Sequence, residues 1–406
     1  MHKIAPIAVT ICLSAGVVSA QQLRFDDVVR NLRNPDPKSR LNAVHLLRDA
    51  KYPEAIVPMA PLVLDPIDEI QLETIAAELG FFLEQDVRSK RMVGFVLEKR
   101  QSAIARKAFD LGPYAVWPRA APPELVTALL TAVDDDNEKV RLDAIYAVGV
   151  IGRAPLAADQ VARLTKALDH YDPAVRAGAA RVIARLKVAE TGDGLIKAVN
   201  DSQADVRYAS MLALGAIGET RAITSLTEQL VYYKKGEGAW SALSALARIA
   251  STASIPVFRE RLLDKDPYIR RAAMEGIGRT RDAESADALE RAATADDAAT
   301  ARLAAVFALQ QLGRNYGARI VDLMASEKII PQAQEYLVEL GPSMSATLLP
   351  RLQEPDANVR EAVADVLGAI GDPSAIPALE AAMKDRDPSV GSAAKRALER
   401  LRSPAR

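Results

Sequence analysis

A short segment recurs along this chain at nearly constant spacing, and no other feature restricts the fold as strongly. Its clearest copies lie at 172–176 (Asp-Pro-Ala-Val-Arg), 266–270 (Asp-Pro-Tyr-Ile-Arg) and 356–360 (Asp-Ala-Asn-Val-Arg). Aligned on the Arg, here called position zero, the regular copies follow one another every 31 residues or so, about the length of a two-helix hairpin. We place roughly twelve copies, with position zero at Arg40, Glu69, Gln101, Arg141, Arg176, Arg207, Ala239, Arg270, Arg302, Ile330, Arg360 and Gly391.

Each part of the segment has a physical role in a helix. The Asp four residues before position zero can accept hydrogen bonds from the first amides of a helix, and the Pro after it suits the first turn. Apolar residues then follow at the spacing of one helical stripe, and a Gly such as Gly218 suits the left-handed end of the helix. A shorter amphipathic stretch such as 222–230 precedes each segment. The pattern therefore predicts a pair of antiparallel helices in every repeat.

These copies resemble the HEAT-like repeats of the phycobilisome-lyase type, in which Asp-Pro-x-Val-Arg opens the second helix and Ala-Leu-Gly-x-Ile-Gly closes it, as at 213–218. The resemblance covers essentially the whole chain after its first twenty residues. It implies an all-α, α-α superhelix, a HEAT/armadillo-like solenoid continuous over 21–406, with an irregular repeat and loop at about 101–125. Because the family includes lyases, hydroxylases and plain scaffolds, the resemblance implies the fold and leaves the function open.

The first twenty residues differ in kind from the repeats. Lys3 precedes an apolar stretch over 4–18, and small residues lead up to Ala20, a pattern typical of a Sec-type signal peptide. We expect cleavage after Ala20 and a periplasmic or secreted protein; an uncleaved N-terminal anchor is the alternative. The remaining chain has no apolar run of about 18 residues, so no membrane span is expected after cleavage.

Charge and residue types argue against several functions. The chain has 52 basic and 53 acidic residues, so no net field favours nucleic acid. Its only cysteine, Cys12, lies in the predicted signal peptide, and its histidines are His2, His45 and His170. None of them forms the His-Glu pair with which the similar deoxyhypusine hydroxylases bind iron, so we predict no metal, cofactor or catalytic residue. A lyase-like or other enzyme and an envelope glycan binder remain the alternatives to a scaffold.

Two positions of each repeat are candidates for contacts outside the core. Position-zero arginines flank the buried stripe, and the resemblance implies that they bond to Asp side chains in neighbouring turns. We therefore expect them to bridge repeats, with a ligand-binding ladder as the alternative. The residues one and five positions after position zero point roughly 180° from the core stripe. Together they form an outward column along the second helices, and by resemblance this column lines the concave face. Its aromatic, apolar and Arg residues suit a protein or peptide groove; tight curvature or flanking helices could instead bury them as packing.

We therefore predict a non-catalytic scaffold that binds a protein or peptide partner non-covalently. Two irregular loops, 113–119 and 232–238, add aromatic residues, with local repair of a degenerate repeat as the alternative for both. The predicted partner-binding residues are Leu142, Tyr146, Arg181, Tyr208, Leu212, Trp240, Arg271, Glu275, Leu303 and Phe307, with Tyr114 and Trp117 from the first loop.

Overall fold

The computed structural model describes residues 24–83 and 104–403. Over these ranges the chain is helical, and its one extended pairing is the bridge between Leu83 and Val116. The chain forms two compact units, Met1–Val182 and Ile183–Arg406, here called the N-terminal and C-terminal units. The predicted signal peptide and the repeat position at Gln101 lie outside the described residues.

The helices alternate between longer ones and shorter ones, which are often extended by a 3₁₀ turn. In the N-terminal unit they are α1 (Phe25–Asn31), α2 (Pro37–Ala50), α3 (Ile56–Met59), α4 (Asp68–Phe82), α5 (Ile104–Asp110), α6 (Pro123–Ala132), α7 (Glu138–Ile151) and α8 (Ala158–Ala167). Helix α9 (Pro173–Leu186) crosses the boundary between the units.

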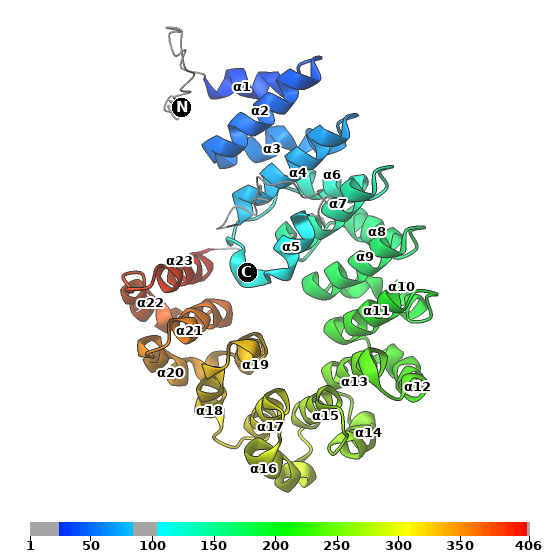
Figure 1. The fold of residues 1–406 in the computed structure, drawn as a ribbon, viewed down its shortest axis with the longest axis vertical. Helices are drawn as coiled ribbons and strands as arrows, with labels where there is room; N and C mark the ends of the chain where they lie inside the picture. The colour runs from blue at the N-terminus through cyan, green and yellow to red at the C-terminus, as the bar shows by residue number, and fades with distance from the viewer. Residues whose placement is uncertain (1–23, 84–103, 404–406) are drawn as a thin grey trace, which may run out of the picture. The chain divides into compact units, whose positions relative to one another are not determined.

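The C-terminal unit continues the same alternation. Its helices are α10 (Gly192–Ala198), α11 (Ala204–Ile217), α12 (Ile223–Tyr233), α13 (Gly236–Ile249), α14 (Ile255–Arg261), α15 (Pro267–Arg279), α16 (Ala286–Ala295), α17 (Ala299–Gln311), α18 (Gly317–Asp322), α19 (Ile330–Leu340), α20 (Ser345–Leu348), α21 (Ala357–Ile370), α22 (Ile376–Ala382) and α23 (Pro388–Arg402). In Figure 1 the odd-numbered second helices of this unit lie on the inner side of a curved array, and the first helices lie outside them. The predicted all-α solenoid of helix pairs is confirmed.

Most of the predicted helix starts are formed as the motif requires. The carboxylates of Asp36, Asp266, Asp356 and Asp387 each accept a hydrogen bond from a backbone amide two residues later. The Asp65 carboxylate also accepts from the amide two residues later, that of Ile67, at 3.0 Å. It does not cap the helix, because α4 begins at Asp68 with Ile67 as its cap.

Neighbouring second helices approach each other through glycine. At three contacts a Cβ added to the glycine would lie 2.5–2.7 Å from the Cα of an alanine on the next helix, closer than real Cβ atoms come. The helices can therefore pack backbone against backbone only because the side chain is absent. The contacts are Gly215 on Ala245, Gly278 on Ala308 and Gly368 on Ala397.

Position-zero arginines in several repeats pair with an Asp of a neighbouring repeat, as predicted. Arg40 donates two hydrogen bonds to the carboxylate of Asp65, at 2.7 and 3.0 Å, and Arg270 does the same to Asp296 at 2.8 and 2.7 Å. A further nitrogen of each guanidinium donates to two backbone carbonyls of its own repeat's loop. Each arginine thus holds its own loop and the next repeat together through a planar, multidentate group. Arg360 repeats this arrangement with Asp385, whereas Arg141 donates a single hydrogen bond to Asp172, at 2.8 Å.

The irregular segment does not add a regular layer to the N-terminal unit. Helix α4 packs directly against α7, and α5 also packs on α7. The Asn137 side-chain amide donates to Asp68, and Gln71 donates to Asp135 at 2.8 Å, so both contacts join repeats that are not consecutive in the sequence. The irregular repeat that the sequence places at about 101–125 therefore departs from the regular stacking of second helices, because α5 packs on α7 while α4 contacts α7 directly.

Candidate binding surface

Helix α5 covers the predicted column of the N-terminal unit at Tyr146. The Tyr146 side chain is buried, its ring packs edge-on against Phe109 at 5.3 Å, and its hydroxyl accepts from Arg106 at 2.6 Å. Arg181 also donates to this hydroxyl, at 3.3 Å. Leu142 is half-buried. For Tyr146 the structure favours packing over an open groove.

Two residues of α7, Asp143 and Gly149, allow α5 to pack against it. The buried Asp143 carboxylate accepts from the Ala105 backbone amide at 2.7 Å, and burial raises the pKa of Asp143 to about 6 although this hydrogen bond lowers it. A Cβ on Gly149 would lie 2.6 Å from the Phe109 ring, so glycine makes room for that ring. Tyr114 and Trp117, in the loop after α5, are half-buried, and the Trp117 amide donates to the Phe82 carbonyl at 2.8 Å. The loop is thereby attached to the end of α4.

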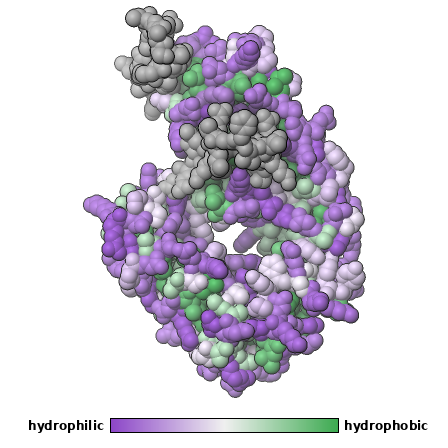
Figure 2. Space-filling view, viewed as in Figure 1, coloured by the Kyte–Doolittle hydropathy of each residue, from purple (hydrophilic) through white to green (hydrophobic). Residues whose placement is uncertain are grey.

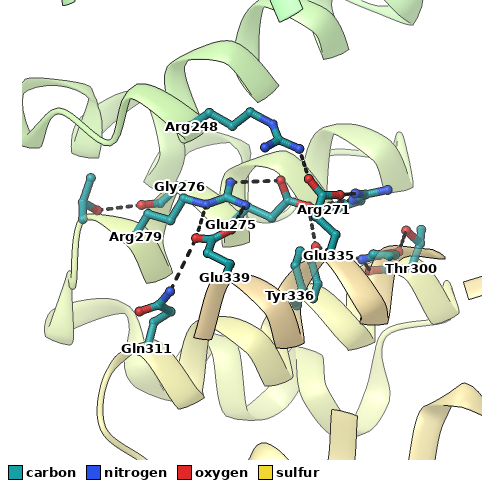
Figure 3. A network of polar contacts seen from close by, with 12 residues as sticks. Arg248, Arg271, Glu275, Gly276, Arg279, Thr300, Gln311, Glu335, Tyr336 and Glu339 are labelled. Carbon is teal, nitrogen blue, oxygen red and sulfur yellow. Dashed lines mark hydrogen bonds and ion pairs between the residues drawn. The ribbon is translucent and has the colours of Figure 1, made fainter. Parts of the chain in front are cut away.

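In the C-terminal unit the column residues on α15 are held in a network of charged side chains (Figure 3). Glu275 is buried, and its carboxylate accepts from Arg271 at 2.7 Å and from Arg279 at 3.3 Å. The Tyr336 hydroxyl on α19 donates to the same carboxylate. Residues two repeats apart therefore meet across α17.

The same network reaches α13. Arg279 donates two hydrogen bonds to Glu339, both at 2.8 Å, and Arg248 on α13 pairs with Glu335 on α19. Gln332 donates to the Tyr336 hydroxyl at 2.9 Å. We call these residues the α15–α19 charge network: Arg248, Arg271, Glu275, Arg279, Gln332, Glu335, Tyr336 and Glu339.

The charges of this network fix the protonation of its centre. Burial alone would raise the pKa of Glu275, but Arg271 and Arg279, with the Tyr336 hydroxyl, outweigh it and lower the pKa to about 2. Burial and then the Glu275 charge raise the pKa of Tyr336 well above its ordinary value. Glu275 is thus an ion at neutral pH and Tyr336 is a neutral hydrogen-bond donor.

Helix α17 lies beneath the network. Leu303 and Phe307 are both 0% exposed. The Phe307 ring stacks on Tyr336 at 4.1 Å, and the Arg279 guanidinium lies 5.4 Å from its centroid. For Leu303, Phe307 and Glu275 the structure therefore favours packing as well. Arg271 stays partly exposed but is held by Glu275.

Sequence reasoning missed this network as a unit. It noted Arg271 and Glu275 in the column but not Arg279, which follows at the next helical turn, or Glu339 on α19. A signal was present, since Arg271, Glu275 and Arg279 are spaced by four residues and so share one helix face. Their partners on α19 lie two repeats away in the sequence, so the repeat pattern does not predict the contact. The local curvature of the array brings α15 and α19 together.

The accessible part of the column lies on α11 and α13. Tyr208, Leu212 and Trp240 are half-buried and belong to no ion pair in the described chain. The Tyr208 ring packs edge-on against Tyr233 at 5.5 Å, and the Trp240 ring lies 6.5 Å from Tyr268, which is 55% exposed. Figure 2 shows a face that is largely hydrophilic, with hydrophobic residues gathered in small patches.

Tyr233 in the second irregular loop has a structural role. Arg207, at position zero, donates to the Tyr233 hydroxyl at 2.5 Å, where other position-zero arginines reach an Asp of the next repeat. This contact favours repair of the degenerate repeat for Tyr233. Its neighbour Tyr232 is 74% exposed and has no such role.

Two further features bear on the site. In the part of the chain that the structure describes, no group of three or more His, Cys, Asp or Glu side chains is arranged to hold a metal ion. Across the same residues, none of the helices combines the length and the apolar character needed to cross a bilayer.

The stacked helix pairs define an α-α solenoid, and comparison with known families agrees. The family model described as HEAT repeats matches residues 161–232, 235–310 and 345–406, together more than half of the chain. The chain belongs to the HEAT-repeat family. No curated protein matches the sequence.

Solved structures with similar folds share little sequence with this chain. An engineered protein is 18% identical, with a TM-score of 0.42, covering 93% of this chain and 99% of its own. The complex of CpcE and CpcF of phycocyanin lyase from Nostoc sp. PCC7120 is 18% identical, with a TM-score of 0.38 and coverage of 78% and 99%. Human deoxyhypusine hydroxylase is 20% identical, with a TM-score of 0.30 and coverage of 69% and 96%. These likenesses concern the fold alone.

Proposed function

We propose that this chain is an exported, non-catalytic HEAT-repeat scaffold that binds a protein or peptide partner on the inner face of its C-terminal unit. The accessible column residues Tyr208, Leu212 and Trp240 form the contact surface. They lie on the neighbouring helices α11 and α13, which Figure 1 places on the inner side of that unit.

One observation carries the proposal. Within the predicted column Tyr146, Glu275, Leu303 and Phe307 are buried, whereas Tyr208, Leu212 and Trp240 keep exposed area. The ring contacts of Tyr208 and Trp240 are with Tyr233 and Tyr268, at the rim of the same surface. Tyr and Trp contribute most per residue to protein interfaces, because they bury a large area at a small loss of conformational entropy. A surface of this kind supports partner binding better than catalysis.

The binding surface is tested by a paired substitution. The double variant Tyr208→Ala/Trp240→Ala should lose a partner that the wild-type chain captures from an envelope extract and that then binds in purified form. Tyr171→Ala is the control, because Tyr171 is 74% exposed and lies in the loop before α9, outside the predicted column. Equal binding by the double variant, or a large fall in its melting temperature, contradicts the proposal.

Export is tested separately. A chain produced with residues 1–20 should be recovered outside the cytoplasm with Gln21 as its first residue, as determined by mass spectrometry of the intact protein. An intact N-terminus in a membrane fraction supports the anchor instead. Catalytic turnover would replace the scaffold proposal with an enzyme. Glycan binding that requires Trp240 would replace it with a glycan binder.

A further inference from the structure

We propose that the cleft beside Trp240 binds the cationic side chain of a basic residue, an arginine above all, presented by the protein partner. This inference rests on the proposed function and adds the chemistry of the contact. The cleft has a volume of about 350 Å³ and is lined by Gly236, Glu237, Trp240, Asp266 and Tyr268. It lies where the N-terminal ends of α13 and α15 meet.

The aromatic walls suit a cation. The Trp240 and Tyr268 rings are 6.5 Å apart and inclined at 71°, so they face a ligand from two directions and do not present one flat platform. Aromatic faces attract ammonium and guanidinium groups through the ring quadrupole, and Trp is the most effective of them. A sugar ring, by contrast, stacks best on a single open aromatic face.

The polar walls carry negative charge. Glu237 is exposed and forms no ion pair in the described chain. Asp266 uses one carboxylate oxygen to accept from the Tyr268 amide at 2.9 Å, which leaves its other oxygen for a ligand. Lys235 and Lys265 are close in sequence, but neither lines the cleft. Two carboxylates and two aromatic rings lining one cleft match a guanidinium, which donates from several nitrogens in one plane.

Glycine forms part of the cleft wall. Gly236 has a φ of +74°, a left-handed conformation that favours glycine, and a Cβ built on it would meet nothing within 4 Å. The chain enters α13 at this residue, in the irregular loop at 232–238 that replaces the usual Asp-Pro entry.

The test uses two blocked tripeptides, acetyl-Gly-Arg-Gly-amide and its citrulline counterpart, which has nearly the same shape and no charge. Because Trp117 and Trp240 are the two tryptophans of the chain, a Trp117→Phe background lets fluorescence report on Trp240. We expect a saturable change with the arginine peptide, weakened by salt, and roughly tenfold weaker binding of the citrulline peptide.

Charge-removing variants check the residues. Glu237→Gln alters an exposed side chain, and Asp266→Asn keeps a residue that can cap α15. Each should weaken arginine-peptide binding roughly threefold, and both together roughly tenfold. Asp287→Asn, an exposed carboxylate on α16 that forms no ion pair in the described chain, is the matched control and should change nothing.

The inference is overturned if the citrulline peptide binds equally well, if the double variant binds like wild type, or if an N-acetylglucosamine trisaccharide binds in place of the arginine peptide. Its failure can be told apart from failure of the scaffold proposal. A partner that still needs Tyr208 and Trp240 but not Glu237 and Asp266 leaves the scaffold standing and removes only the arginine contact.

Discussion

The inner face of the C-terminal unit has two regions built from the same repeat offsets with opposite outcomes. In the open region, on α11 and α13, Tyr208, Leu212 and Trp240 keep exposed area. In the closed region, on α15 and α17, Glu275, Leu303 and Phe307 are buried. The difference lies in how far side chains reach across the array. Around α17, Arg and Glu side chains connect helices two or more repeats apart, so the offset of a residue in the repeat does not by itself decide its exposure.

The largest loss of stability is expected from removing the buried aromatic ring of Phe307 in the closed region. Phe307→Ala removes a fully buried ring stacked on Tyr336 and should lower the free energy of unfolding by about 3–5 kcal/mol. Leu212→Ala, at the same offset in the open region, should cost about 1 kcal/mol or less because the side chain is already half-exposed. Urea unfolding measures both, and equal losses would erase the distinction between the two regions.

Breaking the network at its centre should have the next largest effect. Glu275→Ala leaves Arg271 and Arg279 without their buried counter-charge and should cost about 3 kcal/mol. Glu237→Ala, an exposed carboxylate in the open region, should stay within about 0.5 kcal/mol. A loss below about 1 kcal/mol for Glu275→Ala means that the network contributes little to the closed region.

Acid should act on the same carboxylate. The folded pKa of Glu275 is about 2, below its ordinary value of 4.5, so its contribution to stability is complete above pH 4.5 and is lost as the pH falls toward 2. Melting temperatures measured across this range should fall more steeply for wild type than for Glu275→Gln. Parallel curves would show that Glu275 is not the group that titrates.

The smallest effect is expected at the glycine–alanine contacts between second helices, which occur in both regions. Gly278→Ala places a Cβ 2.7 Å from the Cα of Ala308 and should cost about 1–2 kcal/mol, the strain exceeding the gain in helix propensity. Gly80→Ala on α4 is the matched control, because nothing lies within 4 Å of its added Cβ; it should be neutral or stabilising by up to about 1 kcal/mol. A stabilising Gly278→Ala would show that α15 and α17 can separate without loss.

Much of the fold could be predicted because the contacts that define each repeat join residues close together in the sequence. The caps at Asp36 and Asp266 and the bridging role of Arg270 follow from residues within one repeat or its neighbour. The candidate site was predicted less well. Tyr146 and Phe307 satisfied the same pattern as Tyr208 and Trp240, yet they are covered by α5 and by α19, and the repeat pattern contains no information about either cover.

The sequence by itself determined a stack of helix pairs, their caps and the arginines that connect them, because each depends on contacts at a fixed distance along the chain. Tertiary structure alone decided which column residues remain accessible. That depends on the local curvature that brings Glu275 to Tyr336 and on the displacement of α5 onto α7, and both arise from packing between segments that the repeat does not place next to each other.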